Sequence, residues 1–288
     1  MAIESRRVRA ALSYLLVAPA TFLFTVFFIF PILALLAEGF YSTATLQAPS
    51  HLSLENYLTF FSKSAYLNVL AATMRIAVIS TSVVMVISYP LAYLIAKSEN
   101  ELLVKSSLIL IFLSFFVGGV VRNYAWLVMF LPEGLITSLL SHLGLANVRL
   151  LNTELGIIIG LTHFLIPFAT LALVPSIRNI DPFLLEAATS LGATRTQAFV
   201  RITLPLSVPG IIAAVTLSFS LGVSAFVTPL ILGGGIVNML SNLIYIRFAE
   251  IFDYPFGAML SAIMLVTALA ISSGLNVLLM KRVEGVYK

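Results

Sequence analysis

The sequence has no cysteine and few charged residues. None of its 288 residues is Cys, and only 10% are Asp, Glu, Lys or Arg, whereas a soluble domain carries about 25% charged residues. The absence of cysteine excludes disulfide scaffolds, Cys-ligated metal sites and thiol nucleophiles. The shortage of charge leaves too little polar surface for the chain to face water on all sides. We therefore expect lipid to be the solvent for most of the molecule.

Hydrophobic residues make up 60% of the chain, and the mean hydropathy is +1.08. A bilayer-spanning helix needs about 20 mostly apolar residues, and several uncharged runs reach this length. The run 202–246 has 45 residues, enough for one span and an uncharged loop that holds Gly233–Gly235. The sequence predicts an all-α integral membrane protein with six transmembrane helices, near 12–37, 69–96, 105–131, 155–178, 207–232 and 257–280.

The distribution of Lys and Arg predicts the orientation of these helices, because basic residues gather in the cytoplasmic segments of membrane proteins. With the N-terminus inside, 11 of the 16 Lys and Arg residues fall in inner segments and three in outer segments. The other two, Arg75 and Arg122, fall within spans. This bias predicts that both termini are cytoplasmic, and the even number of helices agrees with it.

The first hydrophobic run is interpreted as an anchor. Arg6, Arg7 and Arg9 would suit a signal peptide, but the uncharged run 10–37 has 28 residues, well beyond the roughly 7–15 of a signal sequence. The predicted segments are an N-terminal part with tail, first helix and outer loop at 1–68, a transmembrane core at 69–280 with a cytoplasmic loop at 181–205, and a cytoplasmic tail at 281–288.

The cytoplasmic loop between the fourth and fifth spans has strong helix signals. Asp181 is a good N-cap, Pro182 suits the first helical position, and Gly192 is a natural stop. Thr194 and Gln197 have the spacing of a capping box at a second helix start. We expect two short helices parallel to the membrane and rich in small residues. Such a pair suits a docking element, although an ordinary interfacial loop helix would carry the same caps.

Residues of this loop match a known motif. The matching positions are Glu186-Ala187-Ala188, Gly192, Phe199, Ile202, Leu204-Pro205 and Pro209-Gly210-Ile211. They resemble the "EAA" loop of type I ABC importer membrane subunits, and the resemblance covers nearly the whole chain. It implies the type I ABC importer transmembrane fold. It also implies that the loop forms a coupling helix, which sits in a groove of a cytoplasmic ATPase subunit.

The resemblance implies roles for individual residues and a set of partners. The implied ATPase-coupling residues are Glu186, Ala187, Ala188, Leu191 and Gly192, with loop support from Asp181, Pro182, Phe199 and Pro205. The implied partners are two cytoplasmic ATPase subunits, a second membrane subunit that is homologous but distinct, and an extracytoplasmic solute-binding protein. No cofactor is expected on this chain, since ATP and Mg would bind the partner subunits. The resemblance also implies that the chain lies in the bacterial cytoplasmic (inner) membrane. Membrane lipid is therefore an expected partner, and nucleic acid is not.

Within that family the sequence is most similar to the membrane subunits of spermidine/putrescine importers. The residues that carry this likeness are Tyr89-Pro90-Leu91-Ala92-Tyr93, Arg122-Asn123-Tyr124-Ala125-Trp126 and Ala225-Phe226-Val227-Thr228-Pro229. The likeness implies a polyamine as the solute. Relatives with this pattern import aminophosphonates, opines, amino-acid-like solutes or iron as well, so these solutes stay open as alternatives.

Six residues inside spans are candidates for the solute pathway: Arg122, Tyr124, Trp126, His163, Thr228 and Pro229. An ionisable residue in a span is costly and faces a cavity or a partner by default, yet Arg122 would also fit a structural ion pair or snorkelling. Tyr124 and Trp126 offer either cation–π faces or an aromatic belt at the outer interface. His163 fits a hydrogen-bonded residue equally well. Thr228-Pro229 would loosen the fifth helix and free backbone carbonyls, which is tolerated where they line a cavity.

Three other classes of membrane protein fit the sequence less well. Ion-coupled secondary carriers rely on acidic or His relays and internal repeats, but no predicted span contains Asp or Glu. No His–Glu metal pattern, paired acids or Gly-x-Ser-x-Gly points to an intramembrane enzyme, and a channel would need a more polar lumen. A phosphate-binding Gly-x-x-x-x-Gly-Lys-Ser/Thr loop is also absent. Hydrolysis of ATP is therefore expected on a separate subunit.

Overall fold

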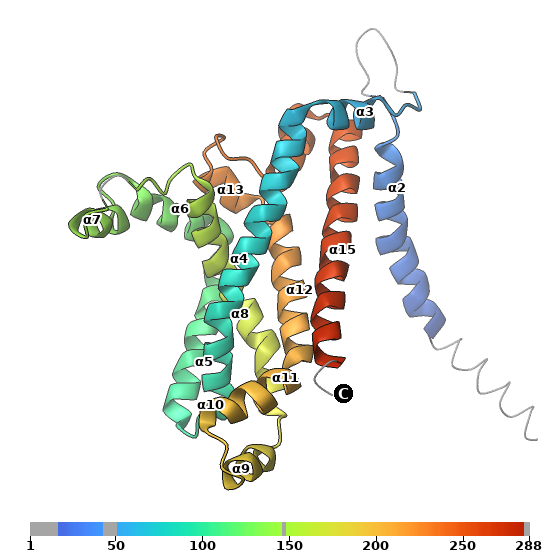
Figure 1. The fold of residues 1–288 in the computed structure, drawn as a ribbon. Coiled ribbons are helices and arrows are strands. Elements are labelled where there is room, and N and C mark those ends of the chain that lie inside the picture. Colours follow the sequence, from blue (N-terminus) through green and yellow to red (C-terminus); the bar gives the residue numbers. More distant parts are fainter. Residues whose placement is uncertain (1–16, 43–50, 146–147, 285–288) are drawn as a thin grey trace, which may run out of the picture. The chain divides into compact units, whose positions relative to one another are not determined.

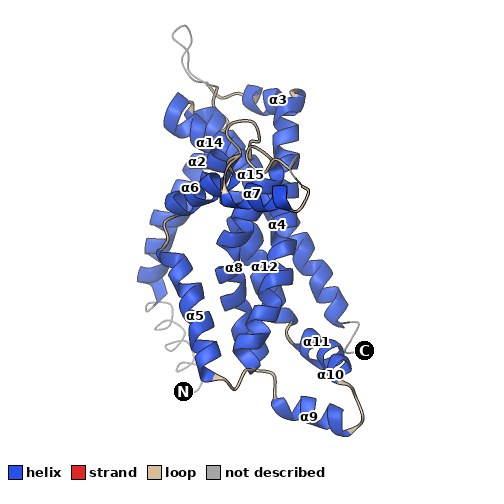
Figure 2. Ribbon diagram, turned by 90° about the vertical axis from the view of Figure 1, so that its left-hand side faces the viewer, coloured by secondary structure: helices blue, strands red, loops and turns tan. Residues whose placement is uncertain are grey.

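The protein is helical throughout the described residues. The structure, a computed structural model, describes residues 17–42, 51–145 and 148–284, with side chains to residue 280. Within these ranges helices and loops account for the fold (Figure 1, Figure 2), apart from one isolated bridge between Tyr41 and Leu52. The predicted all-α class is confirmed. The predicted start of the first helix at 12, the basic residues before it and the last four residues lie outside the described ranges.

Five helices among the described residues are long and apolar enough to cross a membrane, and a bent pair makes a sixth candidate. The five are Val17–Glu38, Ser64–Lys97, Gly119–His142, Glu154–Arg178 and Tyr254–Met280. The bent pair, Arg195–Leu206 and Val208–Ser224, turns by 63° at its break. These spans agree with the predicted six-helix class, while the orientation of the termini stays a prediction.

The predicted third span, 105–131, is not one helix. The structure divides it into α5 (Glu101–Phe116) and α6 (Gly119–Phe130). Between them, Val117 has φ −78° and ψ 108° and Gly118 has φ −54° and ψ 144°, so neither is helical. Glycine is about 1 kcal/mol less favourable than alanine inside a helix, and a glycine pair follows Val117. The prediction of a continuous helix here is wrong. A short α7 (Leu135–His142) follows α6.

The predicted fifth span, 207–232, is interrupted as well. It consists of α12 (Val208–Ser224) and α13 (Val227–Leu232), with Ala225 in an extended conformation between them. Pro229 explains this position, because it has no N–H to donate to the carbonyl four residues earlier, that of Ala225. Ser241 replaces the missing donor, since its Oγ lies 2.8 Å from the Ala225 carbonyl oxygen. The interruption expected at Thr228-Pro229 therefore begins just before these residues.

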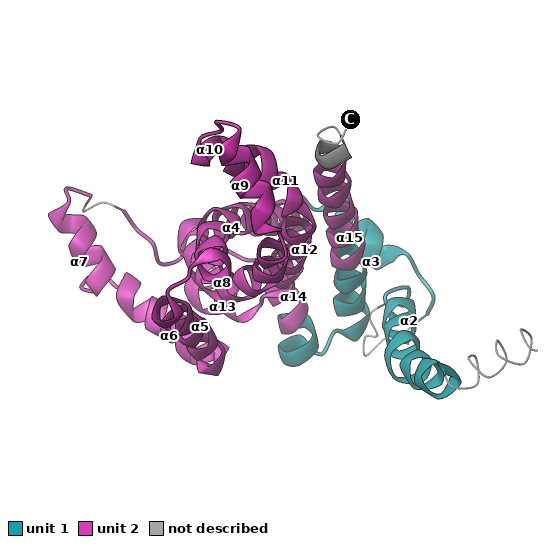
Figure 3. Cartoon of the chain, turned by 90° about the horizontal axis from the view of Figure 1, so that it is seen from below, with its two compact units in different colours: residues 1–63, 246–263 teal, residues 64–245, 264–288 magenta. Residues whose placement is uncertain are grey.

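One of two compact units, residues 64–245 and 264–288, contains the main core (Figure 3). Its centre is α8 (Glu154–Arg178), which packs between α4 (Ser64–Lys97) and α12. Leu161, Leu165 and Leu173 of α8 are fully buried there. At the beginning of α8, the Arg75 guanidinium binds both carboxylate oxygens of Glu154, with Nε to Oε2 at 3.0 Å. This ion pair fastens α4 to α8.

The other unit consists of residues 1–63 and 246–263. Its described helices are the segment Val17–Glu38, which includes the π-helical turn Thr25–Ile29 and α2 (Phe30–Glu38), then α3 (Glu55–Ser62), the π-helical turn Arg247–Ile251 and the first residues of α15 (Tyr254–Glu284). Asn56 of α3 donates to the Tyr41 carbonyl at 3.0 Å, and Arg247 pairs with Asp253 at 3.0 Å. The short α14 (Leu240–Ile246) leads from the first unit into this one. The predicted segments 1–68, 69–280 and 281–288 divide the chain by its expected membrane topology. The two compact units do not test this division, so it stays a prediction.

Candidate functional site

The loop after α8 forms the short helix that its sequence predicts. In α9 (Pro182–Ser190) the Asp181 side chain accepts a hydrogen bond from the Phe183 N–H at 3.0 Å, and Pro182 is the first helical residue. The helix ends at Leu191, and Gly192 then takes φ +88°, in the left-handed region. These caps fix both ends of α9 without help from another part of the chain. The predicted N-cap, first-turn proline and glycine stop are confirmed.

A second capped turn follows at once. In α10 (Arg195–Ala198) Thr194 and Gln197 form the predicted capping box, with the two reciprocal bonds at 3.2 and 2.9 Å. The chain continues through a π-helical turn, η2 (Phe199–Thr203), into α11 (Leu204–Leu206), where Pro205 occupies the first turn. The π-helical turn widens the helix locally, a feature that is frequent at functional sites. The path from α9 to α12 thus consists of the capped helix α9, the Gly192 turn, and a second capped helix that runs from α10 through η2 into α11.

The surface of α9 has no partner within the described chain. None of its residues is buried, and Figure 1 and Figure 2 show it away from the helices of the core. Phe183 is 73% exposed and Leu191, at its C-terminal end, is 89% exposed. Glu186 and Ala187 are exposed and Ala188 is partly so. An isolated helix of nine residues with bare apolar side chains is expected to bury them against another protein.

Aromatic contacts connect this loop to α4. The Phe199 ring meets the rings of Tyr89 and Tyr93 edge-on, with centroids 5.9 and 5.5 Å away. The Tyr89 hydroxyl lies 2.8 Å from the Ser207 Oγ, at the start of α12. Lys97, the last residue of α4, donates to the carbonyl of Ile180, two residues before α9, at 2.8 Å. The loop is therefore fastened to the α4 helix on both sides of α9.

Gly210 lets α12 approach α8 closely, which explains why a glycine stands at this point of the motif. A Cβ at Gly210 would overlap the Ser176 side chain, and the Gly210 N–H donates to the Ser176 Oγ at 3.2 Å. We expect Gly210→Ala to destabilise the protein by about 1–3 kcal/mol, the usual cost of overpacking. The melting temperature of the purified protein would measure this.

Gly274 supplies the matched control. It lies in α15 with no atom within 4 Å of the position a Cβ would take. Gly274→Ala should leave the melting temperature unchanged or raise it, because alanine is favoured over glycine in a helix by about 1 kcal/mol. Equal melting temperatures for the two variants would contradict the close-approach explanation for Gly210.

The two helix breaks face one cavity of about 420 Å³. Val117 and Gly118 line it from the α5–α6 break, and Ala225 and Phe226 line it from the α12–α13 break. Non-helical backbone at membrane depth is tolerated where it lines a cavity or is buried in protein. The α5–α6 and α12–α13 breaks are thus explained by a common feature, a cavity walled partly by main chain.

The side chains around this cavity include polar, aromatic and aliphatic groups. Asn123 is buried and its Nδ2 donates to the Gly119 carbonyl at 2.8 Å, while Thr228 is 4% exposed. The remaining lining consists of Ser114, Phe115, Gly119, Arg122, Phe164, Pro167, Phe168, Leu221, Ser224 and Val227. No acidic residue occurs among the lining residues. Arg122 is the one charged residue in this set.

The Arg122 guanidinium is held by backbone carbonyls and by a ring. Its Nη1 lies 3.4 Å from the Ser114 carbonyl oxygen and 3.5 Å from that of Val117. Its Cζ lies 4.8 Å from the centre of the Phe164 ring, a cation–π arrangement. The buried Nε has no hydrogen-bond partner within the described chain. Arg122 forms no ion pair among the described residues, and its side chain folds back over the break, while the snorkelling alternative stays a prediction.

The other predicted pathway residues lie outside the lining of this cavity. Trp126 donates from its Nε1 to the His163 Nδ1 at 3.1 Å and packs on the core cluster. Tyr124 is 55% exposed, and Pro229 is buried in α13 behind Thr228. Sequence reasoning brought Arg122 and Thr228 to the site but missed Phe164. The glycine pair after Val117 was the available signal for the break, whereas no sequence signal links Phe164 to Arg122.

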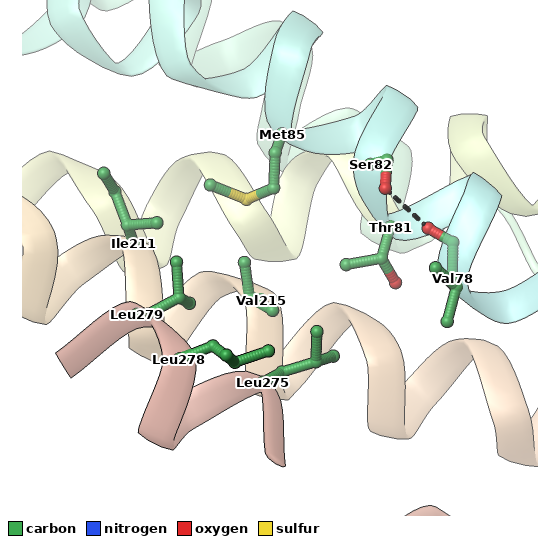
Figure 4. A pocket seen from close by; sticks show the side chains of 9 residues that line it. All are labelled: Val78, Thr81, Ser82, Met85, Ile211, Val215, Leu275, Leu278 and Leu279. Carbon is green, nitrogen blue, oxygen red and sulfur yellow. Dashed lines mark hydrogen bonds between the residues drawn. The ribbon is translucent and has the colours of Figure 1, made fainter. Parts of the chain in front are cut away.

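A larger cavity of about 640 Å³ lies between α4, α12 and α15 (Figure 4). Its lining is aliphatic apart from Met85, Thr81 and Ser82, and the Ser82 hydroxyl is already bound to the Val78 carbonyl at 2.8 Å. No lining residue is charged. It offers a polar solute little to bind, so we place the candidate site at the smaller cavity.

Comparison with known proteins decides the family. Residues 106–285 match the family described as "Binding-protein-dependent transport system inner membrane component". The chain belongs to this family. It is therefore a permease component of a binding-protein-dependent ABC importer, a multi-pass protein of the bacterial inner membrane and a transport component rather than an enzyme. The resemblance drawn from the Glu186–Ile211 motif is confirmed.

Several relatives of this permease are spermidine/putrescine permeases by name. The spermidine/putrescine transport system permease protein PotB of Escherichia coli (strain K12) is 34% identical over 208 residues, 72% of this chain and 75% of PotB. PotB of Haemophilus influenzae is 34% identical over 79% of this chain and 76% of its own length. The inner membrane ABC transporter permease protein YdcU of Escherichia coli (strain K12) is 26% identical over 79% of this chain and 77% of its own.

Solved structures share the fold of the permease. A bacterial ABC transporter involved in the import of the acidic polysaccharide alginate contains a chain with a TM-score of 0.77 and 21% identity, covering 98% of this chain and 99% of that one. An amino acid ABC transporter with histidines gives a TM-score of 0.53 and 16% identity, with 81% and 99% coverage. At these identities the likeness concerns the fold alone, and the predicted type I importer fold is confirmed.

Proposed function

We propose that this permease is one of two membrane subunits of an importer whose ATP hydrolysis occurs on separate cytoplasmic subunits, and that α9 is the element on which an ATPase subunit docks. The observation that carries the proposal is the isolation of α9. It is capped at both ends, the loop around it is attached to α4 on both sides, and none of its residues is buried in the described chain. On this proposal, Glu186, Ala187, Ala188, Leu191 and Gly192 contact the ATPase. Asp181, Pro182, Phe199 and Pro205 hold the loop in place.

The assembly follows from this role. The proposed complex contains two ATPase subunits, this chain, a second homologous but distinct membrane subunit, and an extracytoplasmic solute-binding protein. ATP and Mg would bind the ATPase subunits, and this chain would carry no cofactor. Both termini and α9 face the cytoplasm, as the Lys and Arg bias favours. The loaded binding protein docks on the opposite side.

The proposed solute is a polyamine such as spermidine or putrescine. This rests on the PotB relatives, which match over more than two thirds of both chains. In the proposed cycle, ATP-driven closure of the motor moves α9 as a lever, and the solute passes inward between the two membrane subunits. The cavity at the two helix breaks is its path through this chain. Backbone carbonyls and aromatic rings suit an ammonium group there.

Uptake by the reconstituted complex tests the solute and the motor together. The chain, its co-encoded membrane and ATPase subunits and its binding protein would be placed in proteoliposomes. Radiolabelled spermidine and putrescine would be supplied outside and ATP inside. We expect ATP-dependent accumulation that needs the loaded binding protein. ATP-dependent uptake of a carboxylated or phosphonated solute with no uptake of either polyamine would overturn the polyamine assignment and leave the importer assignment in place.

Leu191→Asp tests the docking of α9 directly. Burying a leucine side chain contributes about 1.5–3 kcal/mol, and every 1.4 kcal/mol changes an affinity about tenfold. A charge at this 89% exposed position should therefore weaken ATPase binding by about tenfold or more without unfolding the chain. Co-purification of the ATPase subunit with the membrane subunits measures it.

The control for this variant is Thr196→Asp, which adds the same charge at an exposed position of the neighbouring α10. An acidic residue in the first turn of a helix is favourable, so α10 should persist. Thr196→Asp should retain the ATPase. Equal retention of the ATPase by Leu191→Asp and by the unchanged protein would exclude Leu191 from the docking surface.

A further inference from the structure

The groups around the Arg122 guanidinium form a site for a cation. The carbonyls of Ser114 and Val117 belong to the C-terminal end of α5, where the last carbonyls lack helical partners and the helix dipole is negative. The face of the Phe164 ring, which carries partial negative charge, lies on another side of the same guanidinium. Carbonyl oxygens and a ring face together are suited to an ammonium or guanidinium group.

The cation that fills this site is tethered to the chain itself. Arg122 lies in the first turn of α6, just beyond the break, and its side chain reaches back to carbonyls five and eight residues earlier. The guanidinium of α6 therefore fills a site at the end of α5, on the other side of the non-helical break. A change in the angle between α5 and α6 would change the distance between the guanidinium and the two carbonyls.

The guanidinium is held loosely. Both of its hydrogen bonds, at 3.4 and 3.5 Å, are longer than the 2.7–3.2 Å of typical N–H···O bonds. Its Nε is buried without a partner, and no carboxylate lines the cavity. The adjacent cavity of about 420 Å³ gives room both for a second cation and for the displaced side chain. A second cation could therefore replace the Arg122 guanidinium at this site.

We propose that Arg122 is an internal substitute for the ammonium group of the solute: it fills a cation subsite made of the Ser114 and Val117 carbonyls and the Phe164 ring, and the solute takes its place during passage. The inference rests on the proposed polyamine function for the identity of the solute, but the cation subsite can be tested without it. The proposed exchange explains why an arginine lies in the path of a cationic solute. Arg122 keeps the subsite filled when no solute is present, so that small cations do not enter it.

Chemical rescue tests the subsite. Arg122→Ala would be purified in the assembled complex with its partner subunits, and its melting temperature measured with and without millimolar methylguanidinium. We expect the substitution to lower the melting temperature and methylguanidinium to restore at least half of the loss, with saturation. The unchanged protein and Arg122→Lys, which both retain a tethered cation, should not respond. Arg122→Met, which keeps an unbranched apolar stem but lacks the guanidinium, serves the same comparison if the alanine variant does not assemble.

The ring provides a matched pair of controls. Phe164 and Phe168 both line the cavity and contact each other, with centroids 5.3 Å apart, but only the Phe164 ring lies under the guanidinium. Arg122→Ala combined with Phe164→Leu should lose the rescue, whereas Arg122→Ala combined with Phe168→Leu should keep it. No restoration in the Arg122 variants, or an equal rise in all proteins tested, would overturn the proposal.

Repeating the rescue experiment with spermidine in place of methylguanidinium distinguishes failure of this proposal from failure of the proposed function. Rescue of Arg122→Ala by both compounds supports the exchange of the arginine for the solute. Rescue by methylguanidinium without rescue by spermidine would leave the cation subsite standing but remove spermidine from it. Failure of methylguanidinium while the unchanged complex takes up spermidine would reject the subsite and leave the importer assignment intact.

Discussion

Replacing Gly192 with valine is expected to abolish solute uptake and to release the ATPase subunit. Gly192 has φ +88°, where a residue with a side chain is strained by roughly 1–2 kcal/mol and a β-branched residue by more. The cheapest relief is a change of backbone direction between α9 and α10. Because the backbone at Gly192 sets the angle between α9 and α10, this change would move the whole docking helix. ATPase co-purification and ATP-dependent uptake would both fall to background.

The glycine requirement here is one of backbone conformation and not of space. A Cβ at Gly192 would meet no atom within 4 Å. Asparagine tolerates the left-handed region better than other non-glycine residues, so Gly192→Asn should retain much of the ATPase and of the uptake. If valine and asparagine impair the complex equally, the side chain itself obstructs the ATPase groove. If neither impairs it, α9 is not the coupling element.

The sequence was sufficient for the local structure of the loop because its signals act over a few residues. The Asp181 cap, the Thr194–Gln197 box and the Gly192 stop each depend on neighbours within one helical turn. The same holds for the positions of the apolar segments, which hydropathy identifies. Such features need no knowledge of the tertiary fold.

The interruptions of the spans could be predicted only in part. Pro229 signalled a break, but its effect falls on the carbonyl four residues earlier, so the interruption lies at Ala225. The break between α5 and α6 was missed because hydropathy over 105–131 stays high through the Gly118–Gly119 pair. Hydropathy reports whether a segment prefers lipid and does not report whether its backbone is helical.

The cavity itself could not be predicted from the sequence, since its walls come from segments far apart in the chain. Phe164 of α8 and Arg122 of α6 meet because both helices pass the same break, although the two residues are 42 positions apart in the sequence. Arg122 and Thr228 were identified as candidates because each is unusual by itself. Arg122 is a charged residue within a span, and Thr228 precedes a proline within a span. Phe164 is an ordinary residue in an apolar helix, and its role depends on its neighbours.

Phe199→Ala is expected to uncouple hydrolysis from uptake. The ring joins the loop to α4 through its contacts with Tyr89 and Tyr93, whereas the caps of α9 do not involve it. Removing a buried Phe side chain costs about 3–5 kcal/mol, and somewhat less at this half-buried position, so the contact between the loop and α4 would be largely lost. We expect the ATPase to stay bound and to hydrolyse ATP, while uptake falls at least about tenfold because α9 no longer moves α4. Uptake and hydrolysis measured on the same proteoliposomes give the ratio.

Val200→Ala is the matched control, because Val200 is the next residue of the same π-helical turn but is 51% exposed. It should leave the ratio of solute molecules to ATP molecules unchanged. A parallel loss of ATPase binding in Phe199→Ala would mean that the ring holds α9 in its docking position. An unchanged ratio in Phe199→Ala would mean that force passes through the Lys97–Ile180 and Tyr89–Ser207 contacts instead.

The Lys97–Ile180 and Tyr89–Ser207 contacts are polar and lie on either side of α9. If they alone attached α9 to the spans, the attachment would depend on two single hydrogen bonds of 2.8 Å. A neutral bond such as Tyr89–Ser207 contributes about 0.5–1.5 kcal/mol net and a bond from the Lys97 ammonium about 1.5–3 kcal/mol. Because a fully buried Phe side chain is worth about 3–5 kcal/mol, the half-buried Phe199 ring is at least a comparable connection between α9 and the spans.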